Sequence, residues 1–199
     1  MTNLKSNGKP KAEEVEPIRN KKDIEKIKQF LAGKENKRDY MLFVVGINVG
    51  LRAGDLLSLR IKDITSNKKI KDSVTIQEEK TDKIRTFELN ESAKKAIQLY
   101  LDSITYNADG YLFASRKGNN QLTVISAHKI IKTLLRDLKI KGNYGTHSLR
   151  KTFGYHLYNN GVTLETIQKM FGHSTQAMTL KYIGITKEVI KSVYHNLNL

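Results

Sequence analysis

Apolar residues recur at helical spacing along most of this 199-residue chain. In residues 90–104, alanine, isoleucine, tyrosine and leucine return every three or four positions behind Asn90, a residue type that caps helix starts well. Residues 73–89 instead contain the strand formers of a β-hairpin, with a turn around residues 81–83. Together these patterns predict a mainly α protein with one small antiparallel β-hairpin or sheet, in the α+β class.

The domain organisation follows from where the patterns stop. Residues 1–19 are rich in Asn, Gly, Lys and Glu and contain both prolines, so we expect a flexible N-terminal arm there. Residues 20–186 show neither an internal repeat nor a long linker, which predicts a single domain. Residues 187–199 are expected to form a helical tail whose apolar face packs within its own chain or docks on a neighbouring protomer.

The charge of the chain limits its partners. Thirty-five Lys and Arg residues against 20 Asp and Glu leave a formal charge of +15, with an isoelectric point near 9.8. This excess favours a polyanion, and nucleic acid is the first choice; the alternative is a lysine-rich surface without a specific partner. There is no cysteine, and the histidines lack a metal-ligand spacing such as HExxH, so we expect no disulfide, metal or cofactor.

Membrane insertion is not expected. The longest apolar run, residues 40–51, is too short to span a bilayer and is typical of a buried helix. The first residues lack the apolar core of a secretory signal. We therefore expect an intracellular protein.

A basic segment between residues 145 and 182 gathers groups that can hold a phosphate. His147 and Arg150 are three residues apart, behind a threonine that can cap a helix, so both would project from the same face of its first turn. His173 follows a glycine suited to ending a helix, and Tyr182 falls on the polar side of a last short helix. No carboxylate belongs to this set, so the cluster suits an anion.

Each of these residues also has an ordinary structural explanation. Tyr182 is one of nine tyrosines and can simply lie on a helix surface. His173 can serve only to cap the carbonyls of the preceding helix. Arg52, which lies among leucines, is either a surface residue or a partly buried cation held for an anion.

Five motifs in order make the chain resemble the tyrosine recombinases, the phage integrase family. Each motif alone is weak, but five in register across about 130 residues are specific. The motifs are GLRAGDLLSLR (50–60), a lysine at the hairpin tip (80), THSLR (146–150), FGHS (171–174) and TLKYIGIT (179–186).

The resemblance covers roughly residues 20–190 and is to the C-terminal catalytic domain of that family. Many members carry in addition an N-terminal helical domain that closes around DNA like a clamp. This chain resembles the short single-domain members instead, and a truncated or helper form is the alternative.

The resemblance also implies the site residues, position by position. The two arginines would stabilise charge on the phosphate oxygens, the hairpin lysine would protonate the leaving 5′ oxygen, and the tyrosine would attack. Lys83 competes with Lys80 for the lysine role, because the register of the turn is uncertain by a residue or two. The implied catalytic residues are Arg52, Lys80, His147, Arg150, His173 and Tyr182, with Asp55 in a supporting position.

The function implied by the resemblance is site-specific DNA recombination through a 3′-phosphotyrosyl intermediate, without ATP, metal or cofactor. The implied partners are double-stranded DNA and other protomers, joined in a tetrameric synapse on DNA and weakly associated away from it. The implied location is the nucleoid of a bacterial or phage-infected cytoplasm. Two alternatives stay open: a non-catalytic DNA-binding accessory protein on the same scaffold, and topoisomerase-like DNA relaxation.

Overall fold

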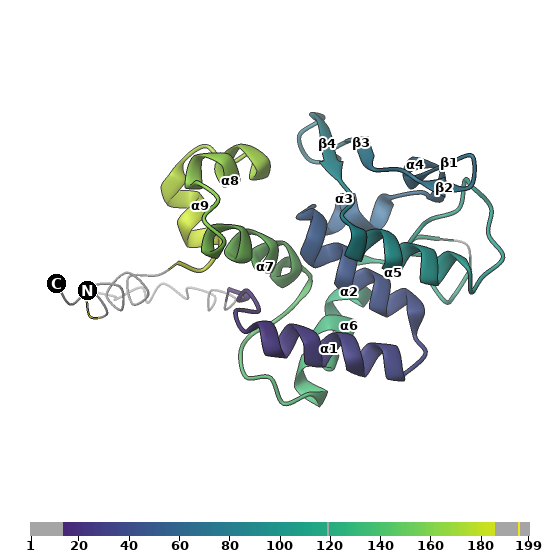
Figure 1. The fold of residues 1–199 in the computed structure, drawn as a ribbon, viewed down its shortest axis with the longest axis horizontal. Helices are drawn as coiled ribbons and strands as arrows, with labels where there is room; N and C mark the ends of the chain where they lie inside the picture. Colours follow the sequence, from purple (N-terminus) through teal and green to yellow (C-terminus); the bar gives the residue numbers. More distant parts are fainter. Residues whose placement is uncertain (1–13, 119, 186–194, 196–199) are drawn as a thin grey trace, which may run out of the picture.

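A computed structural model describes residues 14–118, 120–185 and 195, and these residues are mainly helical (Figure 1). The predicted tail, 187–199, therefore lies outside the described residues apart from position 195. The helices are α1 (Lys21–Gly33), α2 (Lys37–Val49), α3 (Ala53–Ser58), α4 (Ile61–Ile64), α5 (Glu91–Leu101), α6 (Val124–Asp137), α7 (Thr146–Asn159), α8 (Leu164–Phe171) and α9 (Gln176–Tyr182). The strands are β1 (Thr65–Ser66), β2 (Lys69–Ile70), β3 (Ser73–Gln77) and β4 (Ile84–Glu88).

The strands form two antiparallel pairs, β1 with β2 and β3 with β4, which confirms the predicted fold class. In the β3–β4 hairpin, Val74 pairs with Phe87 and both side chains are buried. The next pair, Thr75 and Thr86, shares a hydroxyl hydrogen bond of 2.8 Å on the exposed face. This alternation is the period-two pattern on which the hairpin prediction depended.

Short polar residues fix where many helices begin. In each case the side-chain oxygen accepts a hydrogen bond from a backbone N–H of the first turn, which would otherwise lack a partner. These caps are Asn20, Asn36, Asn90, Thr123, Thr163 and Thr175. At the other end, α2 and α8 finish at Gly50 and Gly172, whose φ angles of 60° and 62° favour glycine.

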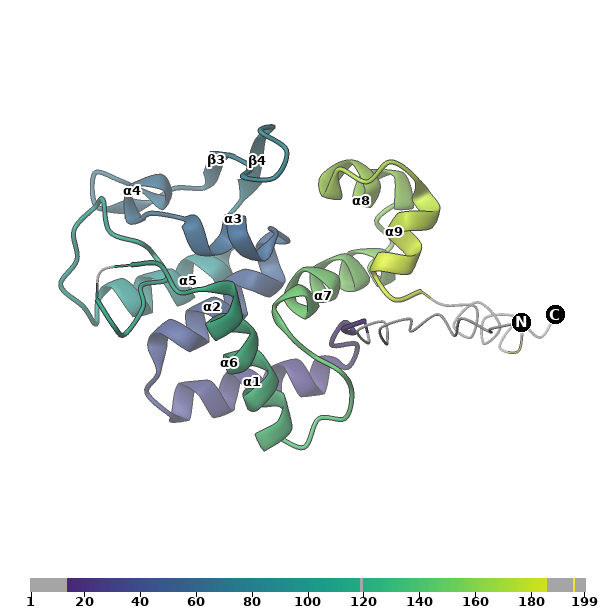
Figure 2. The same cartoon turned by 180° about the vertical axis from the view of Figure 1, so that it is seen from behind.

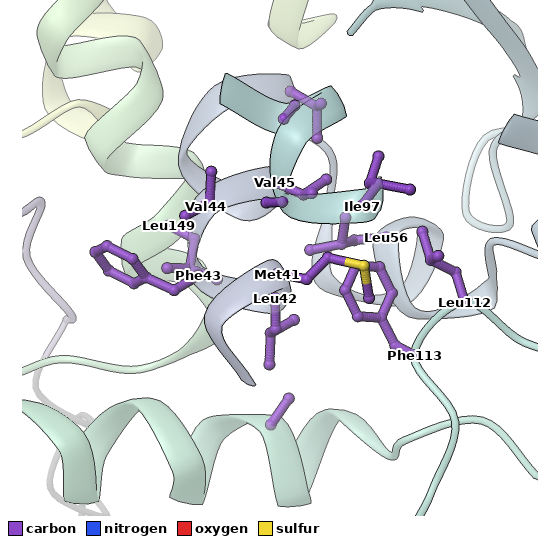
Figure 3. Close-up of a cluster of buried hydrophobic side chains, with 14 of the residues drawn as sticks. Met41, Leu42, Phe43, Val44, Val45, Leu56, Ile97, Leu112, Phe113 and Leu149 are labelled. Carbon is purple, nitrogen blue, oxygen red and sulfur yellow. The ribbon is translucent and has the colours of Figure 1, made fainter. Parts of the chain in front are cut away.

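The main hydrophobic core surrounds α2, which packs against α1, α5 and α7. Residues 41–45 of α2 are buried side by side and contact apolar side chains from several other elements (Figure 3). Gly46 brings α2 close to α7, because a Cβ at that position would lie 2.6 Å from Leu149 Cδ1. The α2–α7 packing therefore fixes the positions from which two arginines project.

A second, smaller cluster holds the C-terminal helices α8 and α9 against the far end of α7. Its buried members are Ile167, Phe171, Ile183 and Ile185. In Figures 1 and 2, α7 joins this cluster to the rest of the fold, and α8 rises on the same side of the molecule as the β3–β4 hairpin. Helix α7 therefore connects the cluster that contains Tyr182 to the main core.

Residues 14–19 belong to the folded body, which corrects the predicted arm over 1–19 in its described part. Ile18 is buried, and its N–H donates to Thr152 Oγ1 at 2.8 Å. The Ile18 carbonyl accepts a hydrogen bond from the His156 ring at 3.0 Å. The polar composition of this segment concealed its two buried residues, Pro17 and Ile18.

No helix within the described ranges has both the length and the apolar character needed to cross a bilayer.

Candidate active site

The carbonyl oxygen of Gly50 joins two arginines from distant parts of the chain. It accepts a hydrogen bond of 2.6 Å from Arg150 Nη1, on α7, and one of 3.3 Å from Arg85 Nη2, on β4. Gly50 is buried in a left-handed turn at the end of α2, and a Cβ there would lie 2.2 Å from the Phe153 ring. Glycine is therefore required both by the backbone and by the packing.

Arg150 is held rigidly at the centre of the site. It is 3% exposed, its Nη2 donates to the Phe171 carbonyl at 2.9 Å, and its guanidinium lies 4.3 Å from the Phe171 ring centroid. Burial lowers the pKa of Arg150 to about 10; Tyr182 opposes this shift, and the positive charges of Arg85 and Arg52 add to it. Arg150 is therefore cationic at neutral pH, in one electrostatic cluster with these residues.

Arg52 lies between two buried carboxylates. Its Nη1 is 2.5 Å from Glu78 Oε2 and 3.8 Å from Asp55 Oδ2. Arg52 Nη1 and Asp55 Oδ2 are nevertheless both buried without a well-formed hydrogen bond to the described residues. This donor is therefore held by an ion pair with Glu78 and not by a well-aligned hydrogen bond.

Glu78 is ionised in this environment. Burial raises the pKa of its carboxyl group, but hydrogen bonds from Thr81 and Arg85 and the close contact with the charge of Arg52 outweigh burial and bring the pKa to about 2. Thr81 Oγ1 donates to Oε2 at 2.6 Å and Arg85 Nη1 donates to Oε1 at 3.3 Å. Sequence reasoning missed Glu78 and Arg85, and their only signal was their place on either side of the predicted turn.

Asp55 anchors the hairpin to α3. Its side chain is 2% exposed, and Oδ1 accepts a 3.0 Å hydrogen bond from the Glu79 N–H at the start of the turn. The next residue, Lys80, is exposed, as is Lys83 later in the turn. Within the described residues Lys80 has neither a hydrogen bond nor an ion pair, so the structure does not bring it into contact with the arginine cluster.

His147 lies in the first turn of α7, and its residue surface is exposed. Its inward side is desolvated, which lowers the pKa of His147, and the positive charges of Lys151, Arg150 and His128 lower it further. The imidazole is therefore neutral near pH 7 and has a nitrogen free to accept a proton.

Tyr182, the last residue of α9, faces the arginines. Its ring meets Phe171 and His173 edge to face, with centroids 5.6 Å and 5.1 Å apart. Burial raises the pKa of Tyr182, and the neighbouring Arg150 and, more weakly, Arg52 lower it. The tyrosine is half-buried within this cluster and is not an ordinary surface residue.

The ring of His173 is oriented within the site and does not take part in a helix cap. Nδ1 is 3.0 Å from Thr179 Oγ1, while the backbone N–H of His173 donates to the Gln168 carbonyl at 3.1 Å. The backbone therefore caps α8 and leaves the imidazole beside Tyr182. Burial lowers the pKa of His173, with further lowering from Arg150 and Arg52.

Lys151 is a third residue that sequence reasoning missed. It follows Arg150 on α7, and its ammonium lies 5.0 Å from the Tyr182 ring centroid. Its partner is Glu14, with 2.6 Å between Nζ and Oε1. The only available signal was its place directly after the HxxR motif.

The described ranges contain no group of three or more His, Asp or Glu side chains that could hold a metal ion. What they contain is a set of cations around a half-buried tyrosine. The arrangement can bind an oxyanion, stabilise added negative charge on it, and present a phenol beside it.

Comparison with known proteins identifies relatives of this arrangement. The phage integrase family matches residues 19–188. The probable integrase/recombinase YoeC of Bacillus subtilis (strain 168) is 37% identical over 180 residues, which cover 90% of this chain and 95% of that protein. Tyrosine recombinase XerA of Pyrococcus furiosus is 28% identical over 200 residues, with 94% of this chain and 68% of that protein covered.

Solved structures share the fold. The crystal structure of XerA recombinase has a TM-score of 0.72 at 26% identity, covering 94% of this chain and 68% of that one. The catalytic domain of bacteriophage HP1 integrase has a TM-score of 0.58 at 21% identity and covers 92% and 95% of the two chains. XerH bound to its difH substrate in a post-cleavage complex has a TM-score of 0.70 at 22% identity, covering 93% of this chain and 54% of that one.

Proposed function

Because this chain belongs to the phage integrase family and spans its tyrosine recombinase catalytic domain, we propose that it cleaves and rejoins DNA at a specific site through a 3′-phosphotyrosyl intermediate. The observation that carries the proposal is the electrostatic cluster of Arg52, Arg150 and Tyr182, which come from three separate segments. The Gly50 carbonyl, two residues before Arg52, accepts hydrogen bonds from Arg150 and Arg85 and so connects the segments of the two site arginines.

The arginines would hold the scissile phosphate. Attack on phosphorus increases the negative charge on the non-bridging oxygens, and fixed guanidiniums stabilise this charge best where water is excluded. Arg150 is already fixed by two carbonyls, and Arg52 has a buried donor without a well-formed hydrogen bond. The phosphate would replace Glu78 as the main partner of Arg52.

Tyr182 would be the nucleophile. Its Oη forms a bond to phosphorus while the bond from phosphorus to the 5′ oxygen breaks. The phenol proton passes to a base, for which His147 is our candidate because its imidazole is neutral near pH 7. His173 would hold the tyrosine ring and donate to a phosphate oxygen, and Asp55 would keep the hairpin in register.

Lys80 would supply the proton that the leaving 5′ oxygen needs. The turn is tied down on both sides of Lys80, by the Glu79 N–H and by the Thr81 hydroxyl, while Lys80 itself is exposed. A closure of the exposed turn on bound DNA would bring the ammonium to the leaving oxygen. The 3′-phosphotyrosyl bond is itself a phosphodiester, so a 5′ hydroxyl from a partner strand reverses the reaction without ATP.

The proposed partner is double-stranded DNA. The formal charge of +15 favours it, and the Tn1549 integrase and XerH, which share this fold, were solved in complex with DNA. Strand exchange joins two duplexes, so we propose that protomers assemble on DNA as a tetramer. Residues 187–199 are the segment we propose to exchange between protomers.

A trapping experiment tests this function. Nicked duplexes with a randomised central segment are incubated with the chain in EDTA, separated on a denaturing gel, and sequenced from any protein–DNA adduct. We expect an adduct with the wild type and with Tyr158→Phe, an exposed tyrosine of α7, but none with Tyr182→Phe. Absence of any wild-type adduct would support the accessory role. If an adduct forms, adding a second duplex distinguishes strand exchange, which joins the two duplexes, from relaxation, which does not.

A further inference from the structure

The ammonium of Lys151 is buried against the proposed nucleophile. The Lys151 side chain is 4% exposed, and Nζ lies 5.0 Å from the Tyr182 ring centroid. A buried ammonium requires a partner, because desolvation penalises an isolated charge. The carboxylate of Glu14 is that partner at 2.6 Å, and its own side chain is 57% exposed.

Glu14 is held in place by the N-terminal segment 14–19. The Glu16 N–H donates to the Asn143 carbonyl at 2.8 Å, before α7, and Ile18 is bonded to α7 itself. Arg19 donates to the carbonyl of Gly184 at 3.4 Å, two residues beyond Tyr182. The segment therefore contacts both the helix that carries Lys151 and the backbone that follows the tyrosine.

We propose that Lys151 is a positioning residue for the nucleophile, that it orients the Tyr182 ring and favours its phenolate form, and that Glu14 limits this effect. The proposal rests on the proposed function, in which Tyr182 attacks the DNA phosphate. A cation over an aromatic face is attracted by the ring quadrupole, which fixes the ring. Once the phenol is deprotonated the attraction becomes one between full charges, so the cation stabilises the phenolate more than the phenol.

Several charged groups face this phenol from different elements, and the variants must separate Lys151 from them. Among the residues that the structure describes, only Lys151 places its ammonium over the ring, whereas the guanidiniums interact with the hydroxyl end. The facing groups are Arg150 and Lys151 on α7, Arg52 at the start of α3, His173 before α9 and Glu14 in the N-terminal segment.

The direct test is the titration of Tyr182 in the DNA-free chain. The chain is labelled with ¹³Cζ-tyrosine, the Tyr182 resonance is assigned with Tyr182→Phe, and its pH midpoint is followed while circular dichroism confirms the fold. We expect Lys151→Met to raise the midpoint by about one pH unit and Glu14→Gln to lower it by about half a unit. Lys151→Arg should restore the wild-type value.

Lys181→Met is the matched control, because it removes an exposed lysine next to Tyr182 in the sequence and should leave the midpoint unchanged. If Lys151→Met fails to fold, the titration of Glu14→Gln tests the proposal instead. This variant should fold, because the Glu14 side chain is largely exposed. A midpoint unchanged in Glu14→Gln and in any folded Lys151→Met would overturn the proposal.

A second readout uses a duplex with the sequence recovered by trapping and a 5′-bridging phosphorothiolate at the cleavage position. The leaving group is then a thiolate, which needs no proton. The cleavage rate of this duplex reports on the nucleophile. Lys151→Met should move the rise of the rate to higher pH, whereas a merely structural role would lower the rate equally at every pH. A wild type that forms no adduct would contradict the proposed function, while the titration would still test Lys151.

Discussion

Glu78 of the hairpin holds Arg52 at the start of α3, with 2.5 Å between Oε2 and Nη1. Arg85, on the opposite strand of the same hairpin, bonds to the other oxygen of this carboxylate. In the proposed function, the phosphate would take the place of this carboxylate beside Arg52. Such an exchange would couple DNA binding to the hairpin that carries Lys80.

Glu78→Gln should therefore strengthen DNA binding and weaken the fold. A neutral amide competes less with the phosphate for Arg52, and we expect the affinity for the trapped duplex to rise about three- to tenfold, a change of about 1 kcal/mol. The lost charged hydrogen bonds should lower the free energy of unfolding by about 1–3 kcal/mol. Fluorescence anisotropy and urea unfolding measure the two effects, and a folded variant that binds DNA no better than the wild type would refute the competition.

The same carboxylate predicts how stability depends on pH. The pKa of Glu78 is lowered from 4.5 to about 2 on folding, so its contribution is present above the unfolded-state pKa and is lost as the pH falls through the folded-state pKa. We expect the free energy of unfolding to fall by about 1–3 kcal/mol more in the wild type than in Glu78→Gln between about pH 5 and pH 2. Urea titrations of both proteins across this range give the comparison, and parallel curves would exclude Glu78 as the source.

Arg150→Lys should damage both the fold and the chemistry. A lysine cannot donate to the Gly50 and Phe171 carbonyls in the same geometry and at the same time face the phosphate as a fork. We expect a loss of about 1–3 kcal/mol in the free energy of unfolding and at least about a hundredfold loss of adduct formation. Arg136→Lys, at an arginine whose side chain is 74% exposed, is the control and should retain wild-type stability.

The roles of Lys80 and Lys83 can be distinguished by changing the leaving group of the DNA substrate. Lys80→Ala should reduce cleavage of an ordinary duplex by about 10²- to 10⁴-fold, as expected for loss of a general acid. On a 5′-bridging phosphorothiolate the same variant should regain most of its rate, because a thiolate needs no proton. Lys83→Ala should be close to the wild type on both duplexes. The reverse pattern would assign the role to Lys83.

The sequence located the residues that belong to motifs. The motifs predicted one set of residues that the structure brings into a single electrostatic cluster: Arg52, Arg150, His173 and Tyr182. They come together because α2 packs closely on α7 at Gly46 and the C-terminal cluster packs on the other end of α7. The mainly α fold and the hairpin followed from periodicity. Lys80 could be placed in the turn, but its contacts could not be predicted, because they depend on how the turn closes.

Other features depend on tertiary contacts that no local pattern encodes. The ion pair between Glu78 and Arg52 follows from the register of the hairpin and its distance from α3. Lys151 reads as one more surface lysine until α9 places Tyr182 over it. The packing of residues 14–19 depends on Pro17 and Ile18, two buried residues in a segment of polar composition.

The most direct test of the account is the chemical identity of the DNA attachment. Trypsin should release residues 182–187 from the trapped adduct, because Lys181 and Lys187 bound this peptide and Tyr182 is its only tyrosine. After nuclease digestion, tandem mass spectrometry should find a 3′-linked nucleotide on the Tyr182 phenol. A nucleotide on any other residue, or an unmodified peptide from a genuine adduct, would contradict the assignment of Tyr182 as the nucleophile.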